Sequence, residues 1–258
     1  MAEYGLMVAP NGARRTRGDH PQLPVTPEQT AKTAAACFAA GAQALHLHVR
    51  DDAGRHSLDA GCYREALEAV QESAPGMAVQ ITTESAGIYD VSAQLACLQA
   101  LRPAAASVSV REMARDPKLA AHAYALSLEA GTRVQHILYG PECIAQLSAW
   151  YQDGTVPGSM RDAIFVLGKY NPPVLAQPGG LAAFRDATAD LRLNWMVCAF
   201  GRHEHACLLA AAAAGGDVRI GFENNIETPE GGLLADNAAS VAAFVQAARD
   251  AGHRLKES

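Results

Sequence analysis

Eight short apolar stretches, each followed by a helix-like segment, recur along this chain and constrain its fold more than any other feature. The stretches expected to be strands are residues 4–9, 44–49, 77–82, 105–110, 133–139, 163–168, 193–199 and 218–222. The segments between them carry helix signals, such as Thr26-Pro27 at a start and Gly41 or Gly131 at a stop. Strands that alternate with helices at short spacing form a parallel sheet, and eight such units predict a (β/α)₈ barrel of the TIM type. A doubly wound open sheet is the alternative, but its glycine-rich phosphate loop is missing after the first strand.

Length and composition fit one soluble barrel domain. The predicted domain spans residues 1–258, because α/β barrels of about 250 residues often form one domain and no composition change marks a linker. The net charge of −6 argues against nucleic acid or an anionic membrane surface as a partner. The six cysteines form no C-x-x-C motif, and the first residues lack the basic segment and apolar run by which a signal peptide is recognised. We therefore expect a reduced, cytoplasmic protein.

The stretch Leu45–Asp51 carries two histidines on one side of a predicted strand. His46 and His48 are two residues apart, and alternate side chains of a strand point to the same face. Two imidazoles so placed can bind one transition metal, for which Zn²⁺ is the best match. The plainer interpretation is a polar strand face without a metal.

Polar side chains also gather where the predicted strands end, which is where barrel enzymes build their active sites. They include Asn11, Arg14, Arg15, Arg50, Asp51, Thr82, Thr83, Glu84, Ser107, Ser109, Arg202, Asn224 and Asn225. Glu223 is the predicted third ligand, because strand alternation puts Arg219, Gly221 and Glu223 on one face. A His-His-Glu set with an open fourth position is a catalytic zinc arrangement. Arg219 is expected to orient a carboxylate or to offset developing charge, and a core ion pair is its alternative role.

A rival metal motif, His203-Glu204-His205, falls at the start of a predicted helix. Residues i and i+2 of a helix point apart, so one metal site built from both histidines is disfavoured. We interpret this motif as a solvated helix start.

Several separate stretches, in one order along nearly the whole chain, resemble a known family. They are Asn11-Gly12-Ala13, residues 19–27, 46–51, 80–83, 165–168, 201–202 and 215–225. Together they resemble the β-keto acid cleavage enzymes. The resemblance implies a zinc-dependent barrel, usually a homotetramer. It also implies a Claisen-type exchange, in which a β-keto acid and acetyl-CoA give acetoacetate and a new acyl-CoA.

The resemblance also implies roles for individual residues. The three predicted ligands would hold the zinc ion, and Arg219 matches the catalytic arginine. Thr82 matches a hydroxyl that contacts the substrate, and Ser107 falls near another. Thr83, the neighbour of Thr82, is grouped with them as a predicted substrate-binding residue.

Departures from the family pattern concern the acids beside the metal. The family usually reads Glu-Asp-Asn where this chain has Glu223-Asn224-Asn225, and an asparagine cannot accept a proton near neutral pH. A second family acid is absent from residues 134–137. Glu84 stands where the family usually has a glycine. We predict that Glu84 supplies a catalytic carboxylate in place of the missing family acids.

Arg14 stands where the family enzyme for an aminated substrate has an acid. An arginine suits a carboxylate or a neutral polar tail by charge complementarity. The predicted substrate is therefore not the amino compound, and a dicarboxylic keto acid fits. Two other functions are left open: a hydrolase, lyase or aldolase-like enzyme that uses metal-bound water, and an impaired protein that only binds keto acids.

Overall fold

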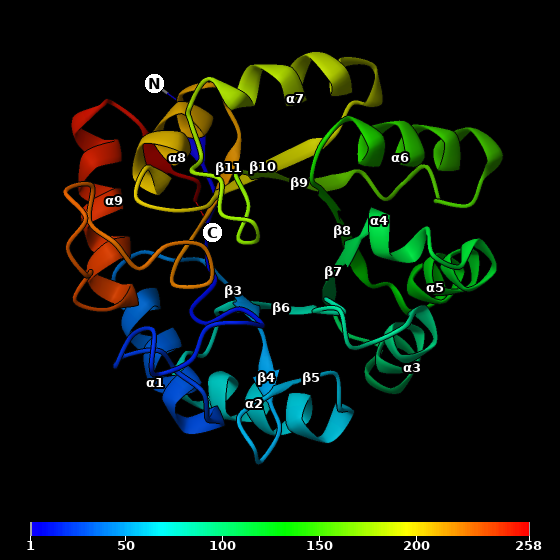
Figure 1. Cartoon of the computed structure of the whole chain (residues 1–258), viewed down its shortest axis with the longest axis horizontal. Coiled ribbons are helices and arrows are strands. Elements are labelled where there is room, and N and C mark those ends of the chain that lie inside the picture. Colours follow the sequence, from blue (N-terminus) through cyan, green and yellow to red (C-terminus); the bar gives the residue numbers. More distant parts are fainter. Residues whose placement is uncertain (1, 258) are drawn as a thin grey trace.

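The predicted strands close into a parallel barrel, with helices around its outside (Figure 1). The computed structural model describes residues 2–257. The barrel strands follow one another in chain order around the ring, and the last, β11, pairs with the first, β2. They are β2 (Leu6–Val8), β3 (Ala44–Leu47), β6 (Ala78–Thr82), β7 (Ala105–Ser109), β8 (Arg133–Leu138), β9 (Asp162–Leu167), β10 (Asn194–Ala199) and β11 (Asp217–Ile220). The predicted (β/α)₈ fold is confirmed.

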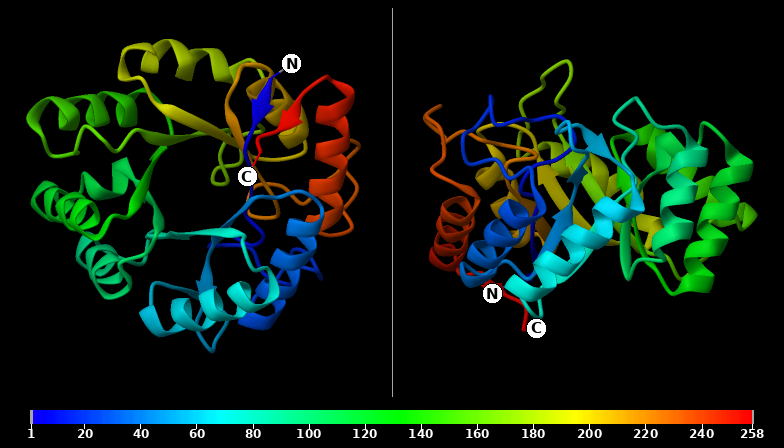
Figure 2. Two further views of the ribbon diagram at one scale, coloured as in Figure 1. Left: turned by 180° about the vertical axis from the view of Figure 1, so that it is seen from behind. Right: turned by 90° about the horizontal axis from the view of Figure 1, so that it is seen from below.

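The helices cover the outer face of the barrel in both further views (Figure 2). They are α1 (Pro27–Ala39), α2 (Ala60–Ser73), α3 (Val91–Leu101), α4 (Val110–Met113), α5 (Pro117–Ala130), α6 (Pro141–Asp153), α7 (Gly180–Thr188), α8 (Glu204–Ala213) and α9 (Asn237–Asp250), with a 3₁₀ turn, η1 (Ala189–Leu191). The start of α1 is as predicted: Thr26 and Gln29 form a capping box, and Pro27 occupies the first turn. None of the helices within residues 2–257 has both the length and the apolar composition to cross a bilayer.

Two predicted strands are divided in the structure, because at each one part of the predicted strand pairs outside the barrel. Residues 4–9 divide at Gly5 into β1 (Glu3–Tyr4) and β2, and β1 pairs with β12 (Arg254–Leu255) instead of a barrel strand. Because β1 precedes β2, this added pair lies at the amino end of the barrel, where both termini are found (Figure 2). The predicted strand 44–49 ends at Leu47, and β4 (Val49–Arg50) then pairs with β5 (His56–Ser57).

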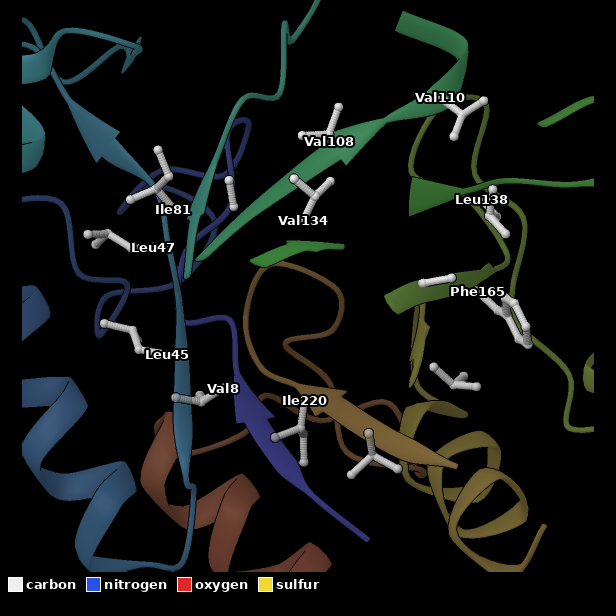
Figure 3. Packing of buried hydrophobic residues seen from close by; sticks show 14 of the residues in the cluster. Val8, Leu45, Leu47, Ile81, Val108, Val110, Val134, Leu138, Phe165 and Ile220 are labelled. Carbon is white, nitrogen blue, oxygen red and sulfur yellow. The ribbon is translucent and has the colours of Figure 1, made fainter. Parts of the chain in front are cut away.

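Strand alternation sorts the buried side chains into two layers. Leu45, Leu47 and Ile81 belong to the large apolar cluster between barrel and helices (Figure 3). A smaller apolar cluster comes from residues of opposite parity and includes Ile137, Ile164 and Met196. These residues fill the barrel interior, as in other barrels of this fold. The interior also holds the polar residues that lead to the site.

Candidate active site

Three metal-ligating side chains converge at the carboxyl end of the barrel. His46 is on β3, His48 follows it, and Glu223 follows β11. The Nε2 atoms of the two histidines are 3.1 Å apart. Glu223 Oε2 lies 3.5 Å from Nε2 of His46 and 3.4 Å from Nε2 of His48. Tetrahedral zinc with bonds of about 2.0–2.1 Å holds its ligand atoms about 3.3–3.4 Å apart, so the trio fits that ion.

The polar atoms of this trio also fit a metal. Glu223 Oε2 is buried and has no hydrogen-bond partner among the described residues. Two imidazole nitrogens at contact distance need either a proton or a cation between them. Burial lowers the pKa of His46 well below its ordinary value, and the nearby Arg219 lowers it further. His46 therefore stays neutral, which is the form that binds a metal.

Glu223 reaches the site through a turn, which corrects the sequence argument. Strand alternation was the predicted reason for its position, but β11 ends at Ile220. Gly221 then adopts a φ of +135°, and a Cβ there would lie 2.5 Å from the carbonyl oxygen of Ala9. The backbone N–H of Glu223 donates to that same carbonyl. Only glycine fits this turn, and the turn aims the carboxylate at the histidines.

Gly12 makes room for the same carboxylate from the opposite side. Its φ is +65°, and a Cβ at this position would lie 2.5 Å from Cγ of Glu223. Arg50 donates hydrogen bonds to the carbonyls of Gly12, Ala13 and Arg15, and so fixes the loop. Arg50 was grouped with the candidate site residues, but in the structure it supports this loop.

A chain of amides behind His46 was not predicted. Nδ1 of His46 lies 2.8 Å from Oε1 of Gln80, which accepts only, so Nδ1 carries the proton and Nε2 is free for a metal. Nε2 of Gln80 donates to Oε1 of Gln135, and Nε2 of Gln135 contacts the sulfur of Met196. Strand parity could have indicated Gln80, because it shares a face with Thr82 and pairs with His46 across β3 and β6.

Arg219 forms the electrostatic centre of the site. Its guanidinium is buried and donates to Oε1 of Glu223 at 2.9 Å. Burial raises the pKa of the Glu223 carboxyl, but Arg219 and the two histidines outweigh burial, so its net pKa is below the ordinary value. Nε of Arg219 has no hydrogen-bond partner among the described residues.

Glu84 approaches the trio from the loop after β6. Its Oε2 lies 4.0 Å from Nε2 of His48, and its Oε1 lies 4.0 Å from Arg14. His56 contacts the Glu84 carbonyl at 2.7 Å and Glu112 accepts from the N–H of Ser85, so the loop is held on both sides. Burial raises the pKa of Glu84, and His48 opposes that rise. Arg14, Glu84 and Glu223 line one small cavity of about 40 Å³.

The three predicted substrate hydroxyls lie deeper. The Ser107 hydroxyl donates to Oγ1 of Thr82, which also accepts from the N–H of Glu84. Oγ1 of Thr83 donates to the Ser107 carbonyl between neighbouring strands. The structure therefore brings Thr82 and Ser107 together beneath Glu84, whereas the hydroxyl of Thr83 is engaged by the backbone.

Asn224 is buried directly beside Glu223 and Arg219. Its backbone is held at both ends, since its N–H donates to Gly221 and its carbonyl accepts from Gly201. Its Oδ1 accepts a long hydrogen bond of 3.5 Å from Arg219. Its Nδ2 is buried without a partner among the described residues.

The interpretation of residues 203–205 as a solvated helix start is wrong for Glu204. This side chain is fully buried, and its Oε1 accepts from the N–H of Gly221 at 3.1 Å. Burial raises the pKa of Glu204 well above its ordinary value. The sequence contains no signal for this, because the partner turn lies on another strand. The flanking histidines bind elsewhere: His203 contacts the Ala176 carbonyl and His205 contacts Ser240.

A larger groove adjoins the small cavity. Its volume is about 510 Å³, and Arg15, Tyr170 and Phe200 line both spaces. The groove runs past Asn224 toward the loop that follows β9. The groove therefore lies next to the small cavity that Glu223 lines.

Comparison with known proteins places this geometry in a family. The family model for β-keto acid cleavage enzymes matches residues 5–258. The chain belongs to the β-keto acid cleavage enzyme family. It is 26% identical over 258 residues to the 3-keto-5-aminohexanoate cleavage enzyme of Fusobacterium nucleatum, covering 95% of this chain and 90% of that protein. It is also 26% identical over 248 residues to the 3-oxoadipate:acetyl-CoA acetyltransferase of Cupriavidus necator, covering 92% and 85%.

Solved structures agree on the fold of this family member. The ternary complex of ObcA with a C4-CoA adduct and oxalate superposes with a TM-score of 0.69 at 14% identity. The match covers 92% of this chain but only 65% of the ObcA chain.

Proposed function

We propose that this protein is a β-keto acid:acetyl-CoA C-acyltransferase. The reaction converts R–CO–CH₂–COO⁻ and acetyl-CoA into acetoacetate and R–CO–CoA. The observation that carries the proposal is the trio His46, His48 and Glu223, with zinc-like spacing, on a barrel of this family. Two curated relatives, from Cupriavidus necator and Paraburkholderia graminis, are named as acetyl-CoA-dependent transferases.

Zinc is the proposed cofactor, and when bound it would act as a Lewis acid on the keto acid oxygens. Gln80 keeps His46 in the tautomer that leaves Nε2 free for the ion. Arg219 compensates the Glu223 carboxylate, and its guanidinium is the proposed donor to negative charge that develops on the keto acid. Thr82 and Ser107 are the proposed substrate-contact hydroxyls, and Thr83 supports them through the β7 backbone.

Glu84 is the proposed general base. It is the carboxylate nearest the trio besides Glu223, and the asparagine at 224 cannot accept a proton. Glu84 takes a proton from C2 of the keto acid, and the resulting carbanion attacks the thioester carbon of acetyl-CoA. CoA thiolate leaves and then attacks the original keto carbon. The C2–C3 bond breaks, acyl-CoA is released, and the acetoacetate carbanion regains a proton from Glu84.

Arg14 is the proposed determinant of the substrate tail. It is exposed at the rim of the small cavity, 4.0 Å from Glu84. A guanidinium there favours a substrate whose far end carries a carboxylate. The relative from Cupriavidus necator is named for 3-oxoadipate, a keto acid of this kind. We further propose a homotetramer in the cytoplasm, which size-exclusion chromatography with light scattering can test for assembly.

A substrate panel tests the proposed function. The zinc-loaded protein is mixed with acetyl-CoA and β-keto acids whose tails are anionic, neutral or cationic, and acyl-CoA products are measured by mass spectrometry. We expect acyl-CoA from the anionic tail, and loss of the product after chelation. Free CoA and acetate without acyl-CoA would instead favour a hydrolase that uses metal-bound water. Binding without any product would favour a keto-acid-binding protein.

A further inference from the structure

We propose that Glu204 and Asn237 are positioning residues, which hold the turn after β11 in the place where the Glu223 carboxylate can bind the metal. Both would act through backbone N–H groups, without touching the metal or the substrate. The inference rests on the zinc site of the proposed function and extends that site to two helices outside the barrel, α8 and α9 (Figure 1).

The turn depends on side chains because its backbone has donors that no strand satisfies. β11 ends at Ile220, so Gly221 and Phe222 lie beyond the barrel ladder. Their consecutive N–H groups donate to side chains, and no backbone carbonyl within residues 2–257 accepts from either of them. Both residues are buried, where an unpaired N–H is costly. The two accepting side chains therefore decide where this turn can lie.

Glu204 accepts from the first of these donors. It is the first residue of α8, is fully buried, and its Oε1 lies 3.1 Å from the backbone nitrogen of Gly221. The loop just before α8 binds the turn a second time, because the N–H of Gly201 donates to the carbonyl of Asn224 at 3.1 Å. These two bonds lie on either side of Glu223 in the sequence, so the start of α8 fixes the backbone of the ligand from both directions.

Asn237 accepts from the second donor. It is the buried first residue of α9, and its Oδ1 accepts from the N–H of Phe222 at 2.9 Å. Its Nδ2 donates to the carbonyl of Pro10 at 3.1 Å. Pro10 belongs to the loop after β2, in which Gly12 leaves room for the Glu223 side chain. One amide thus ties the turn to the loop that faces it.

A small displacement of this turn would reach the metal. Glu223 Oε2 lies 3.5 Å from Nε2 of His46 and 3.4 Å from Nε2 of His48. Metal sites require ligand distances within about 0.2 Å of their ideal values. The Glu223 side chain packs against Gly12, where even an added Cβ would lie 2.5 Å from its Cγ. The carboxylate has little room to adjust when its backbone moves, so the anchoring of the turn should control metal affinity.

Metal binding without substrate tests the two residues directly. Zinc affinity is measured by competition with a chromophoric chelator, and the visible absorption of bound Co²⁺ reports the ligand geometry. For Glu204→Leu, which removes the acceptor, we expect a loss of zinc affinity of about tenfold or more and an altered Co²⁺ spectrum. Glu204→Gln keeps an oxygen for the N–H of Gly221, so its affinity and spectrum should stay near those of the wild type. Asn237→Ala should repeat the loss, and it carries the test if Glu204→Leu does not fold.

A double variant separates positioning from general stability. Glu223→Ala removes the carboxylate and leaves a weaker site of two histidines. If Glu204 acts through Glu223, adding Glu204→Leu to Glu223→Ala should change zinc affinity less than about twofold. Asp217→Leu is the matched control, because Asp217 also accepts from a glycine N–H, that of Gly5, but at the amino end of β11. This control should lower the melting temperature and leave zinc affinity within about twofold of the wild type.

Three results overturn the inference. Unchanged zinc affinity in both Glu204→Leu and Asn237→Ala would show that the turn keeps its place without these side chains. Equal losses in Glu204→Leu and Asp217→Leu would indicate a general loss of stability. An undiminished effect of Glu204→Leu in the Glu223→Ala background would mean that Glu204 does not act through this ligand. The proposed function fails separately, because a wild type that binds zinc but forms no acyl-CoA would refute the reaction and leave these affinities measurable.

Discussion

Replacement of Gln80 by leucine should weaken metal binding without touching a ligand. Gln80 accepts from Nδ1 of His46 at 2.8 Å and donates to Gln135 at 3.2 Å, and all three residues are buried. Leucine has a similar size but removes both bonds. The partner of a metal-bound histidine typically contributes 10–100-fold in affinity, or about 1.4–2.7 kcal/mol. Leaving Nδ1 of His46 and Oε1 of Gln135 unpaired should also lower the free energy of unfolding by about 1–3 kcal/mol for each group.

Gln80→Glu is the matched variant, because its carboxylate still accepts from His46. The side-chain amide of Gln135 can then rotate so that its Nε2 group donates to the new carboxylate. Zinc affinity is measured by competition with a chromophoric chelator, and stability by urea denaturation of the metal-free protein. We expect Gln80→Leu to lose at least tenfold in affinity and Gln80→Glu to stay near the wild type. Affinities within twofold for both variants would refute the argument that this amide orients His46.

Three further results are expected. Glu84→Gln should lower C2 proton exchange and turnover about 10²–10⁴-fold while zinc content stays constant, and unchanged turnover would exclude Glu84 as the base. Arg14→Glu should shift the ratio of kcat/KM values from an anionic toward a cationic keto acid tail at least tenfold, and an unaltered ratio would show that Arg14 does not read the tail. Burial lowers the pKa of His136 to about 4, so between pH 6.5 and pH 4 the unfolded chain binds one more proton and stability falls with decreasing pH. Denaturation of the wild type and His136→Gln at pH 7 and pH 5 should show the stability difference shrinking by about 2 kcal/mol at pH 5, and a constant difference would contradict that pKa.

The barrel could be predicted because its signals are local. Each strand is a short apolar stretch, and helix starts such as Thr26-Pro27 satisfy their own backbone N–H groups. The ends of strands were less predictable, because the chain leaves the barrel next to Gly5 and Leu47. There β1 pairs with β12, far along the chain, and β4 forms a hairpin with β5. The pairing partners, not the local sequence, decide those boundaries.

The residues of the candidate site also differ in how well the local sequence predicts their positions. His46 and His48 follow from strand alternation, and the structure brings both to Glu223. The position of Glu223 depends instead on the Gly221 turn, whose N–H is bound by the buried Glu204 from α8. A carboxylate at a helix start looks solvated in sequence, since the sequence cannot show which backbone N–H will lie against it. The role of Gln80 could have been predicted from the sequence, because strand alternation points its side chain into the barrel interior beside His46.

The central claim is that the enzyme exchanges acyl groups between a β-keto acid and acetyl-CoA. The direct test uses zinc-loaded protein, a keto acid with an anionic tail, and acetyl-CoA labelled with ¹³C in the acetyl group. Carbon NMR should find the label in the C3 and C4 carbons of acetoacetate, and mass spectrometry should find unlabelled acyl-CoA in equal amount. Label appearing as free acetate, with no acyl-CoA from the keto acid, would contradict the claim.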